Sequence, residues 1–366
     1  MSTKVVLGLQ HGDEGKGRIV DDLVQDWATV VVRFQGGGNA GHTVYDKDNN
    51  KFVTHILPVG ILSPSVLNVI SKGCVLDAYD FYEEVNNLNF KPTITLKVSS
   101  LCPIIEPTHK LIDKIKYQKK LGTTAKGIGP AYSDFFARDS ILVRDLVANP
   151  KQSLIKIQDK FFDFQAQRAQ NGENFKDLEK DFENFNIWQS KYKEIVDMIS
   201  YYMFDDDINK ESFVSMLDKE GEKILLEGAQ GSGLNIYSSN YPNVTSSAPT
   251  IGSVLNSTGL NHKQINEVIG VLKSYKTKVG SGDFPSIITD GQEKTLAEIG
   301  KEFGATTGRP RQCGWLDFDE LKSAVSENGV DHLCIVKTDV MTHIKSPRVY
   351  AAGELISIPR INKVCT

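Results

Sequence analysis

The chain has 366 residues, of which 40% are hydrophobic and 24% charged, and its formal net charge at pH 7 is -4. This length and balance suit one large α/β domain or two smaller ones and argue against long-range disorder. The net negative charge argues against a dedicated nucleic-acid binder, and no apolar run reaches the 18 residues expected of a membrane span.

The cysteines and the beginning of the chain indicate the compartment. The five cysteines are scattered without a C-x-x-C pair, as expected of reduced thiols. The first four residues lead directly into a strand pattern, with no secretory signal. We therefore expect a cytoplasmic protein without a membrane partner.

A glycine-rich turn at residues 8–17 joins the first strand pattern to a helix pattern. Val5–Leu7 form a short apolar run typical of a buried strand, and apolar residues recur with helical spacing from Ile19. Backbone N–H groups at a helix start, together with Lys16, favour an anion. The spacing fits neither the P-loop nor the dinucleotide fingerprint, so we predict a phosphate loop of a different kind.

A second strand pattern, residues 29–34, runs into a second glycine-rich turn at 35–44. His42 stands at the exit of this turn between small residues. Such neighbours expose the imidazole, which favours a general acid beside a phosphate over a buried packing residue.

The middle of the chain alternates helix and strand patterns. We expect helices over 78–88 and 107–119, and a strand over 94–98. Two threonines follow in a glycine-rich loop at 121–132, where hydroxyls and amides suit a phosphate. Residues 146–220 predict a mostly helical segment, broken at 172–174 and laid on the outside of the sheet.

Three further strand patterns lie in the last third of the chain, at 223–227, 268–272 and 333–339. Near them, Arg309 and Arg311 flank a proline after a Thr-Thr-Gly turn, and arginine forks suit carboxylates and phosphates.

Strand patterns that repeatedly end in glycine-rich polar loops predict the fold class. We expect an α/β fold with a large, mostly parallel central sheet, helices on both faces and helical insertions. In such sheets ligands lie at the carboxyl ends of the strands. We therefore expect one cleft, lined by the loops at 12–17, 36–43, 228–233 and 306–311.

Taken together, these motifs resemble the adenylosuccinate synthetase family. The resemblance covers about residues 4–340, over which several motifs keep the family's order. The matching motifs are Gly12-Asp13-Glu14-Gly15-Lys16-Gly17, Gln35-Gly36-Gly37, Asn39-Ala40-Gly41-His42-Thr43, Gly122-Thr123-Thr124, Gly127 to Tyr132, Glu227 to Gly231, Tyr241-Pro242, Val244 to Ser247, Ala305 to Arg311 and Gly314 to Asp317.

The resemblance implies a ligase that joins L-aspartate to C6 of IMP with GTP and Mg²⁺. The 6-oxygen is phosphorylated first, and the amine of aspartate then displaces phosphate. Asp13 would take the purine N1 proton and, with the carbonyl of Gly41, hold Mg²⁺. His42 would be the acid that stabilises the transferring phosphoryl group, and Gln230 would join these catalytic residues.

The same resemblance assigns the binding residues. The phosphoryl donor and its metal would contact Gly12, Asp13, Glu14, Gly15, Lys16, Gly17, Arg18, Gly41, His42, Thr43, Arg311, Lys337, Thr338 and Asp339. The purine nucleotide and aspartate would contact Asn39, Ala40, Thr124, Arg138, Gln230, Thr245, Ala305, Thr306, Thr307, Gly308, Arg309 and Arg311. Arg138 would reach the site of a neighbouring subunit, which implies a homodimer. The chain is expected to be a single domain over 1–366, with the helical insertion at about 146–220.

Departures from the family pattern leave alternatives open. The chain ends 27 residues after Asp339, without the late segment that covers guanine in longer members, so GTP, ATP and dATP all remain candidate donors. Altered loops at 248–252 and 279–286 are compatible with a compact phage branch that acts on dGMP. We favour IMP because we expect a residue smaller than Asp13 beside a 2-amino group. A nucleotide-binding regulatory protein without catalysis is a third alternative, which could dispense with Asp13, His42 and Arg309.

Overall fold

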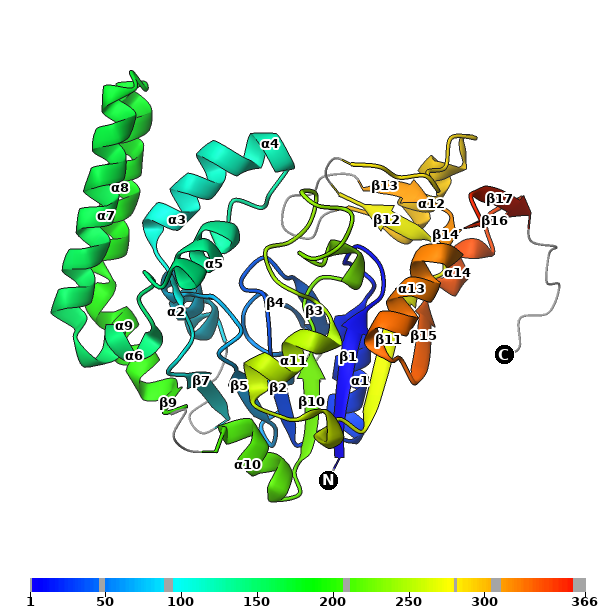
Figure 1. Ribbon diagram of the computed structural model, residues 1–366, viewed down its shortest axis with the longest axis horizontal. Helices are drawn as coiled ribbons and strands as arrows, with labels where there is room; N and C mark the ends of the chain where they lie inside the picture. Colours follow the sequence, from blue (N-terminus) through cyan, green and yellow to red (C-terminus); the bar gives the residue numbers. More distant parts are fainter. Residues whose placement is uncertain are drawn as a thin grey trace.

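The fold is built on a central sheet of eight strands. The computed structural model describes residues 2–45, 50–88, 95–206, 211–279, 282–303 and 311–357. Within these residues every pairing in the central sheet is parallel, in the order β15-β11-β1-β10-β2-β5-β7-β9 (Figure 1). In the same order, the strands are His332–Val336, Glu267–Lys273, Ser2–Gly8, Lys223–Glu227, Val30–Arg33, Leu67–Ile70, Leu96–Ser99 and Met203–Phe204. The predicted fold class is confirmed.

Strand β1 shows why the strands of the central sheet have continuous apolar sequences. Val5, Val6 and Leu7 are at most 1% exposed. Successive side chains of a strand point to opposite faces of a sheet, so Val5 and Leu7 enter one core cluster and Val6 another. Because helices cover both faces, the pattern is apolar without alternation, as expected of a buried parallel sheet.

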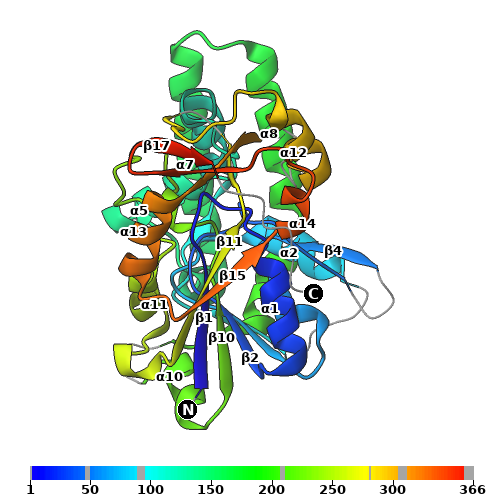
Figure 2. The same cartoon turned by 90° about the vertical axis from the view of Figure 1, so that its right-hand side faces the viewer.

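Helices surround this sheet in Figures 1 and 2. They are α1 Lys16–Asp26, α2 Ala78–Asn86, α3 Pro107–Ile112, α4 Lys119–Leu121, α5 Ile128–Ala137, α6 Val143–Ala148, α7 Pro150–Gln170, α8 Phe175–Ser190, α9 Tyr192–Tyr202, α10 Phe213–Lys219, α11 Ile251–Thr258, α12 Gln292–Gly300, α13 Phe318–Asn328 and α14 Thr338–Met341. Among the described residues, none of these helices is both long enough and apolar enough to cross a membrane.

The helical segment carries a long hairpin, α7–α8, that projects from the body of the molecule (Figure 1). Gly172 turns the chain between the two helices with a φ of 76°, and the side chain of Asn174 caps α8 by accepting from the N–H of Lys176. The expectation that residues 146–220 lie wholly outside the sheet is wrong at one point. β9 pairs with β7 and forms an edge of the central sheet.

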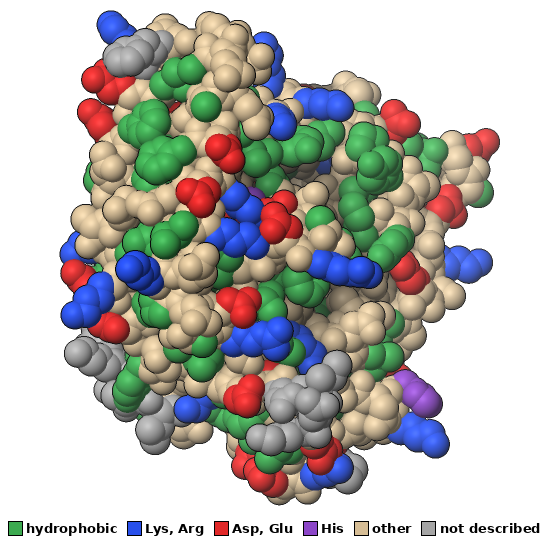
Figure 3. All heavy atoms as spheres, turned by 60° about the vertical axis from the view of Figure 1, so that its left-hand side comes forward, with side chains coloured by type: hydrophobic (Ala, Val, Ile, Leu, Met, Phe, Trp, Pro, Cys, Tyr) green, Lys and Arg blue, Asp and Glu red, His purple; other side chains and the backbone are tan. Residues whose placement is uncertain are grey.

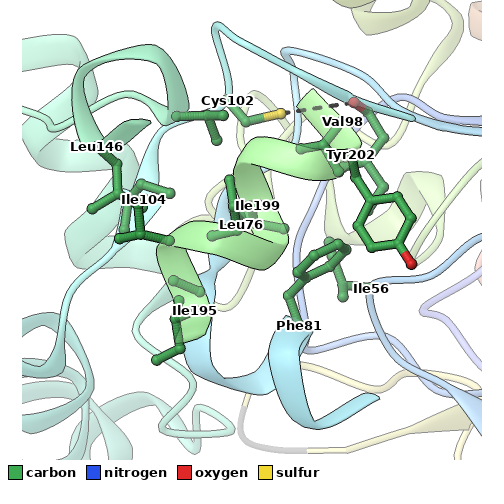
Figure 4. Packing of buried hydrophobic residues seen from close by; sticks show 14 of the residues in the cluster. Ile56, Leu76, Phe81, Val98, Cys102, Ile104, Leu146, Ile195, Ile199 and Tyr202 are labelled. Carbon is green, nitrogen blue, oxygen red and sulfur yellow. Dashed lines mark hydrogen bonds between the residues drawn. The ribbon is translucent and has the colours of Figure 1, made fainter. Parts of the chain in front are cut away.

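A buried cluster fastens this segment to the sheet. In Figure 4, Ile195, Ile199 and Tyr202 lie on one side of α9, at the i, i+4 and i+7 spacing of a helix face, and pack against Val98 of β7 and Phe81 of α2. The rings of Phe81 and Tyr202 meet edge to face, with centroids 6.1 Å apart. The segment and the sheet therefore share one core.

Smaller sheets lie beside the large one. The strands β3 His42–Tyr45 and β4 Lys51–Thr54, β6 Leu76–Asp77 and β8 Ile104–Ile105, and β12 Lys276–Lys278 and β13 Gln312–Gly314 form pairs, and β14 Leu316–Asp317, β16 Arg348–Ala351 and β17 Glu354–Ser357 form a three-stranded sheet. Strand β12 follows β11 closely, and β13 begins directly after Arg311. The pairing of β12 with β13 therefore brings Arg311, a predicted site residue, close to the end of β11.

The outer surface mixes both signs of charge. On the face shown in Figure 3, acidic and basic side chains lie close together, with hydrophobic side chains between them. This mixture accords with the small net charge of the chain.

Candidate active site at the carboxyl ends of the strands

Three of the predicted loops meet at the carboxyl ends of β1, β2 and β10, which are neighbours through β10. A Cβ added to Gly17 would lie 2.9 Å from Cβ of His42, and one added to Gly36 would lie 3.1 Å from Oε1 of Gln230. Glycine is therefore required at Gly17, where the first loop meets the second. The expected convergence of these three loops is confirmed.

The first loop is organised around a buried carboxylate, Glu14. It accepts hydrogen bonds from the backbone N–H groups of Gln10 (3.1 Å) and Gly12 (2.8 Å) and from Nζ of Lys16 (2.6 Å). Burial raises the pKa of Glu14, but Lys16 and these hydrogen bonds outweigh it, and the net pKa lies below its usual value. Lys16 is 3% exposed and neutralises Glu14, so an incoming phosphate would share this cation with the loop.

Asp13 faces the opposite way from Glu14. Its φ is 59°, in the left-handed region between Gly12 (89°) and Gly15 (86°), and its side chain is 42% exposed. A non-glycine residue in this region costs about 1 kcal/mol or more, and such strain gathers at functional sites. Oδ2 of Asp13 lies 2.9 Å from an NH2 nitrogen of Arg311.

His42, at the start of β3, is held by Glu227, the last residue of β10. The side chain of His42 is 9% exposed, so the expectation of an exposed imidazole is wrong, because the pair with Glu227 draws the ring inward. Nδ1 of His42 lies 2.5 Å from Oε1 of Glu227, whose other oxygen accepts from the N–H of Val59 (2.9 Å). Arg33 is fully buried, and its NH1 nitrogen lies 3.4 Å from Oε1 of Glu227. Its Nε and NH2 nitrogens have no hydrogen-bond partner in the part of the chain that the structure describes. Burial lowers the pKa of His42 below its usual value although Glu227 opposes the shift.

The sequence analysis did not single out Glu227 as a functional residue. The available signal was a carboxylate closing an otherwise apolar strand pattern of the sheet. A buried carboxylate at such a strand end requires partners, and here one of them is the predicted acid.

The purine-side residues include buried polar atoms without partners. Both amide atoms of Gln230 and Oδ1 of Asn39 are buried and unpartnered among the described residues. Buried polar groups are normally hydrogen-bonded, so these atoms indicate the place of a polar ligand. Gln230 also has a φ of 56°, which aims its side chain at Gly36.

Hydrogen bonds from Gln35 and Thr245 hold the loop that carries Gln230 in place. Gln35 donates to the carbonyl of Ala229 (2.5 Å) and accepts from the hydroxyl of Ser247 (3.2 Å). Thr245, half-buried, donates its backbone N–H to Leu234. The predicted residue Thr245 is thus joined to the loop that carries Gln230.

Residues of the second loop lie around His42. Gly41 and Thr43 are half-buried on either side of it, and Ala40 is buried. The carbonyl of Ala40 lies 2.8 Å from Nδ1 of His55, an additional contact that holds this turn.

Thr124 and Arg138 lie on the surface of the molecule outside the three converging loops. Thr124 precedes α5, and Arg138 follows it. Both side chains are exposed. The α5 start approaches the purine-side loop, because a Cβ on Gly129 would lie 3.1 Å from Oγ of Ser246. Arg138 ends α5 with a φ of 64° and lies at the far end of the helix.

The predicted donor residues at the end of β15 lie near the first loop. A Cβ on Gly15 would be 3.8 Å from Cγ2 of Val336. The strand ends at Val336, earlier than expected, because Lys337 has a φ of 61° and Thr338–Met341 form α14. Nζ of Lys337 donates to the carbonyl of Gly300, and Thr338 and Asp339 are exposed.

Arg18 and residues 305–309 differ from the other predicted site residues. Arg18 directs its guanidinium away to Asp22 on the exposed face of α1, so its side chain is not brought to the site. The residues Ala305, Thr306, Thr307, Gly308 and Arg309 lie outside the described residues.

Among the described residues, one group of side chains has the spacing of metal ligands, but it lies away from the converging loops. Glu106, His109 and Asp134 hold ligand atoms within 4.8 Å of one another. Nδ1 of His109 accepts from the N–H of Glu106, so Nε2 carries a proton, and Nζ of Lys160 lies 2.8 Å from Asp134. A protonated lysine and a protonated imidazole nitrogen occupy the position a cation would need. A groove of about 640 Å³ nearby, along α7, is likewise remote from the converging loops.

Comparisons with known proteins agree with this geometry. The model of the adenylosuccinate synthetase family matches residues 5–355. The adenylosuccinate synthetase of Halothermothrix orenii is 40% identical over 359 residues, which cover 95% of this chain and 80% of that protein. That of Syntrophomonas wolfei is 38% identical, covering 98% and 83%.

Two solved structures resemble the fold. The fully ligated adenylosuccinate synthetase of Plasmodium falciparum superimposes with a TM-score of 0.83 at 33% identity, covering 97% of this chain and 83% of that one. The succinoaminodeoxyadenylate synthetase of cyanophage S-2L, bound to dGMP and dATP, gives 0.66 at 19% identity, covering 91% and 84%. The second likeness concerns the fold alone.

Proposed function

Since this chain belongs to the adenylosuccinate synthetase family, it is a C–N ligase that joins L-aspartate to IMP, and we propose that it uses GTP and Mg²⁺ and passes through a 6-phosphoryl intermediate. The observation that carries the proposal is the pair of unpartnered amide atoms of Gln230, next to the loops of Asp13 and His42. An amide that can both donate and accept suits the edge of a purine.

Asp13 and His42 divide the proton transfers in this proposal. Asp13, partly exposed at the loop tip, removes the N1 proton, so negative charge builds on the purine 6-oxygen. His42, oriented by Glu227, stabilises the phosphoryl group during transfer to that oxygen. A base and an acid held on separate strand ends supply the positioning and charge stabilisation that phosphoryl transfer requires.

The phosphate loop would hold the donor. Lys16 and the N–H groups of residues 13–17 can bind its phosphates at the start of α1. Lys337, Thr338 and Asp339 would meet the base, since an Asp carboxylate can accept two N–H bonds from guanine. This is the reason to propose GTP over ATP or dATP.

The residues present fit Mg²⁺. The carboxylate of Asp13 is 42% exposed on the first loop, which meets the turn that carries the Gly41 carbonyl where Gly17 contacts His42. Both groups offer the hard oxygen ligands that this ion prefers. The ion would neutralise phosphate charge. Before it binds, Arg311 supplies a positive partner to Asp13.

The remaining assignments are also proposals. The purine nucleotide would contact Asn39, Ala40, Thr124, Gln230, Thr245 and Arg309, and aspartate would contact 305–309 with Arg311. Arg138 would reach a second subunit in a homodimer, an arrangement supported by its exposure beside Phe136, which is 74% exposed. The chain would be one domain with a helical insertion at about 146–220, in the cytoplasm, without a nucleic-acid or membrane partner.

A product analysis tests the proposal. IMP, GMP and dGMP are offered separately with aspartate, Mg²⁺ and either GTP or ATP, and products are weighed by mass spectrometry. We expect a succinylated product from IMP with GTP, and ¹⁸O placed on C6 of IMP should appear in the released phosphate. A product from dGMP alone would support the phage-type activity, and no product from any combination would support a binding protein without catalysis.

A further inference from the structure

We propose that Glu302 is a positioning residue for this ligase, acting through Arg311 to set how the site holds the carboxylates of L-aspartate. The inference rests on the proposed function, which assigns Arg311 to aspartate. No sequence motif singled out Glu302, which follows α12.

The contacts of Glu302 form a closed set of donors. Its side chain is 1% exposed. Nζ of Lys273 lies 3.3 Å from both carboxylate oxygens, the hydroxyl of Tyr275 donates at 2.5 Å, and an NH1 nitrogen of Arg311 donates at 2.6 Å. The backbone also joins the two residues, because the N–H of Arg311 donates to the carbonyl of Glu302.

The guanidinium of Arg311 therefore has two ends with different partners. NH1 is fixed by buried Glu302, while NH2 reaches Asp13, whose side chain is 42% exposed. Nε is buried without a partner among the described residues. A planar, rigid fork that is bound on one side presents its other side at a defined angle. Glu302 thus determines which face of Arg311 meets the open site.

The charges explain why a carboxylate is required here. Burial raises the pKa of Glu302, but Lys273, Tyr275 and Arg311 outweigh it, and the net pKa lies below its usual value. Glu302 is therefore ionised and separates two cations, Lys273 and Arg311. Without its charge, NH1 of Arg311 would lose its buried anionic partner, and the guanidinium would move toward Asp13, where an incoming carboxylate must compete for it.

The surrounding framework is anchored to the phosphate loop. Gln10, directly after β1 and at the start of this loop, donates to the carbonyls of Lys273 and Tyr275 and accepts from the N–H of Lys273. The residues that bind Glu302 are consequently fixed relative to the loop that carries Asp13.

The test is the variant Glu302→Gln, which keeps the side-chain shape and removes the charge. If the proposed function is wrong, the wild-type protein does not turn over IMP. If only the proposed role of Glu302 is wrong, the wild-type protein is active and the KM values of the variant equal those of the wild type. We expect the KM for L-aspartate to rise about tenfold or more and the KM for IMP to stay within about twofold. The KM for GTP should rise less than that for aspartate, because Arg311 is also assigned to the phosphoryl donor. An unchanged KM for aspartate, or an equal rise for all three substrates, would overturn the proposal.

Two further variants separate positioning from stability. Asp181→Asn removes a buried carboxylate that pairs with Arg168 at 2.6 Å on the remote α7–α8 hairpin, and it should lower Tm without changing any KM. Glu302→Gln combined with Lys273→Met removes the unbalanced cation. If Glu302 only neutralises Lys273, the double variant recovers the wild-type KM for aspartate; if Glu302 positions Arg311, the KM stays high.

Discussion

Nδ1 of His42 lies 2.5 Å from Oε1 of Glu227, at the end of the strand next to the phosphate-loop strand. The proton between Nδ1 and the carboxylate belongs to Nδ1, so Nε2 is the nitrogen left for a ligand, and His42 acts there as an acid when the imidazole carries a second proton on Nε2. The proposed acid therefore depends on a residue more than 180 positions away.

The variant Glu227→Gln tests this dependence. We expect kcat to fall by at least about 100-fold, because an amide can bind the wrong tautomer of the imidazole, as in other triads. Stability should also fall, since Arg33 would lose its buried anion. Steady-state kinetics and urea unfolding measure both. The control is Glu267→Gln, whose half-buried pair with Lys4 and contact with exposed His332 should contribute about 1 kcal/mol. Equal kcat values for Glu227→Gln and wild type would contradict the role of Glu227.

Lys16 and Glu14 should be coupled in the substrate-free protein. Lys16→Met leaves the buried carboxylate of Glu14 uncompensated, and we expect a loss of about 3–5 kcal/mol in the free energy of unfolding. Glu14→Gln combined with Lys16→Met should recover part of this stability but no activity. Denaturant titrations of the three variants measure the coupling. If the two single losses simply add, the pair is not coupled.

His11 should make the protein less stable as the pH falls. Burial, with help from Lys276 and Lys278, lowers its pKa from 6.5 to about 3 in the folded protein. Below pH 6.5 the unfolded chain therefore binds a proton that the folded protein refuses. Between pH 7 and pH 5, wild type should lose about 2 kcal/mol more unfolding free energy than His11→Gln. Parallel pH curves for the two proteins would show that His11 is not responsible.

The surface around Arg138 should be a dimer interface. Phe136 is 74% exposed, and its ring meets that of Phe135 edge to face. Phe136→Glu should shift sedimentation toward the monomer and lower activity most at low protein concentration. The control Ile187→Glu changes a side chain that is 56% exposed on α8 and should leave the association state unchanged. A dimer that survives Phe136→Glu would place the interface elsewhere.

The helical insertion should unfold together with the sheet. The three tryptophans, Trp27, Trp188 and Trp315, lie in or against three different core clusters. Proteins that retain one tryptophan each, with phenylalanine at the other two positions, should give the same urea midpoint by fluorescence. An earlier midpoint for the Trp188 reporter would instead mark residues 146–220 as a separate unit.

The strands of the sheet could be predicted because they are buried on both faces. Lys223–Glu227 is the clearest example, since its apolar run and its following glycine loop are both local. β9 could not be predicted, because two residues, Met203 and Phe204, give no periodicity. Only its pairing with β7, about 100 residues earlier, makes it a strand.

Local sequence patterns likewise predict some residues of the candidate site and not others. Asp13, Lys16 and His42 could be predicted from glycine-rich turns after strand patterns. Glu227 and Glu302 could not, because their roles come from contacts with residues far away in the sequence. The Asp13–Arg311 ion pair joins residues almost 300 positions apart, and no local pattern carries that information.

The position of β1 in the sheet has a consequence for synthesis of the chain. Its two neighbours are β10 and β11, so β1 finds both partners only after Lys273 has been added. At 5–20 residues per second, the 265 residues after Gly8 take roughly 13–50 s. During that interval the apolar strand lacks at least one of its two neighbours. Nascent chains stalled before Lys273 should therefore bind chaperones more strongly than nascent chains stalled beyond β15.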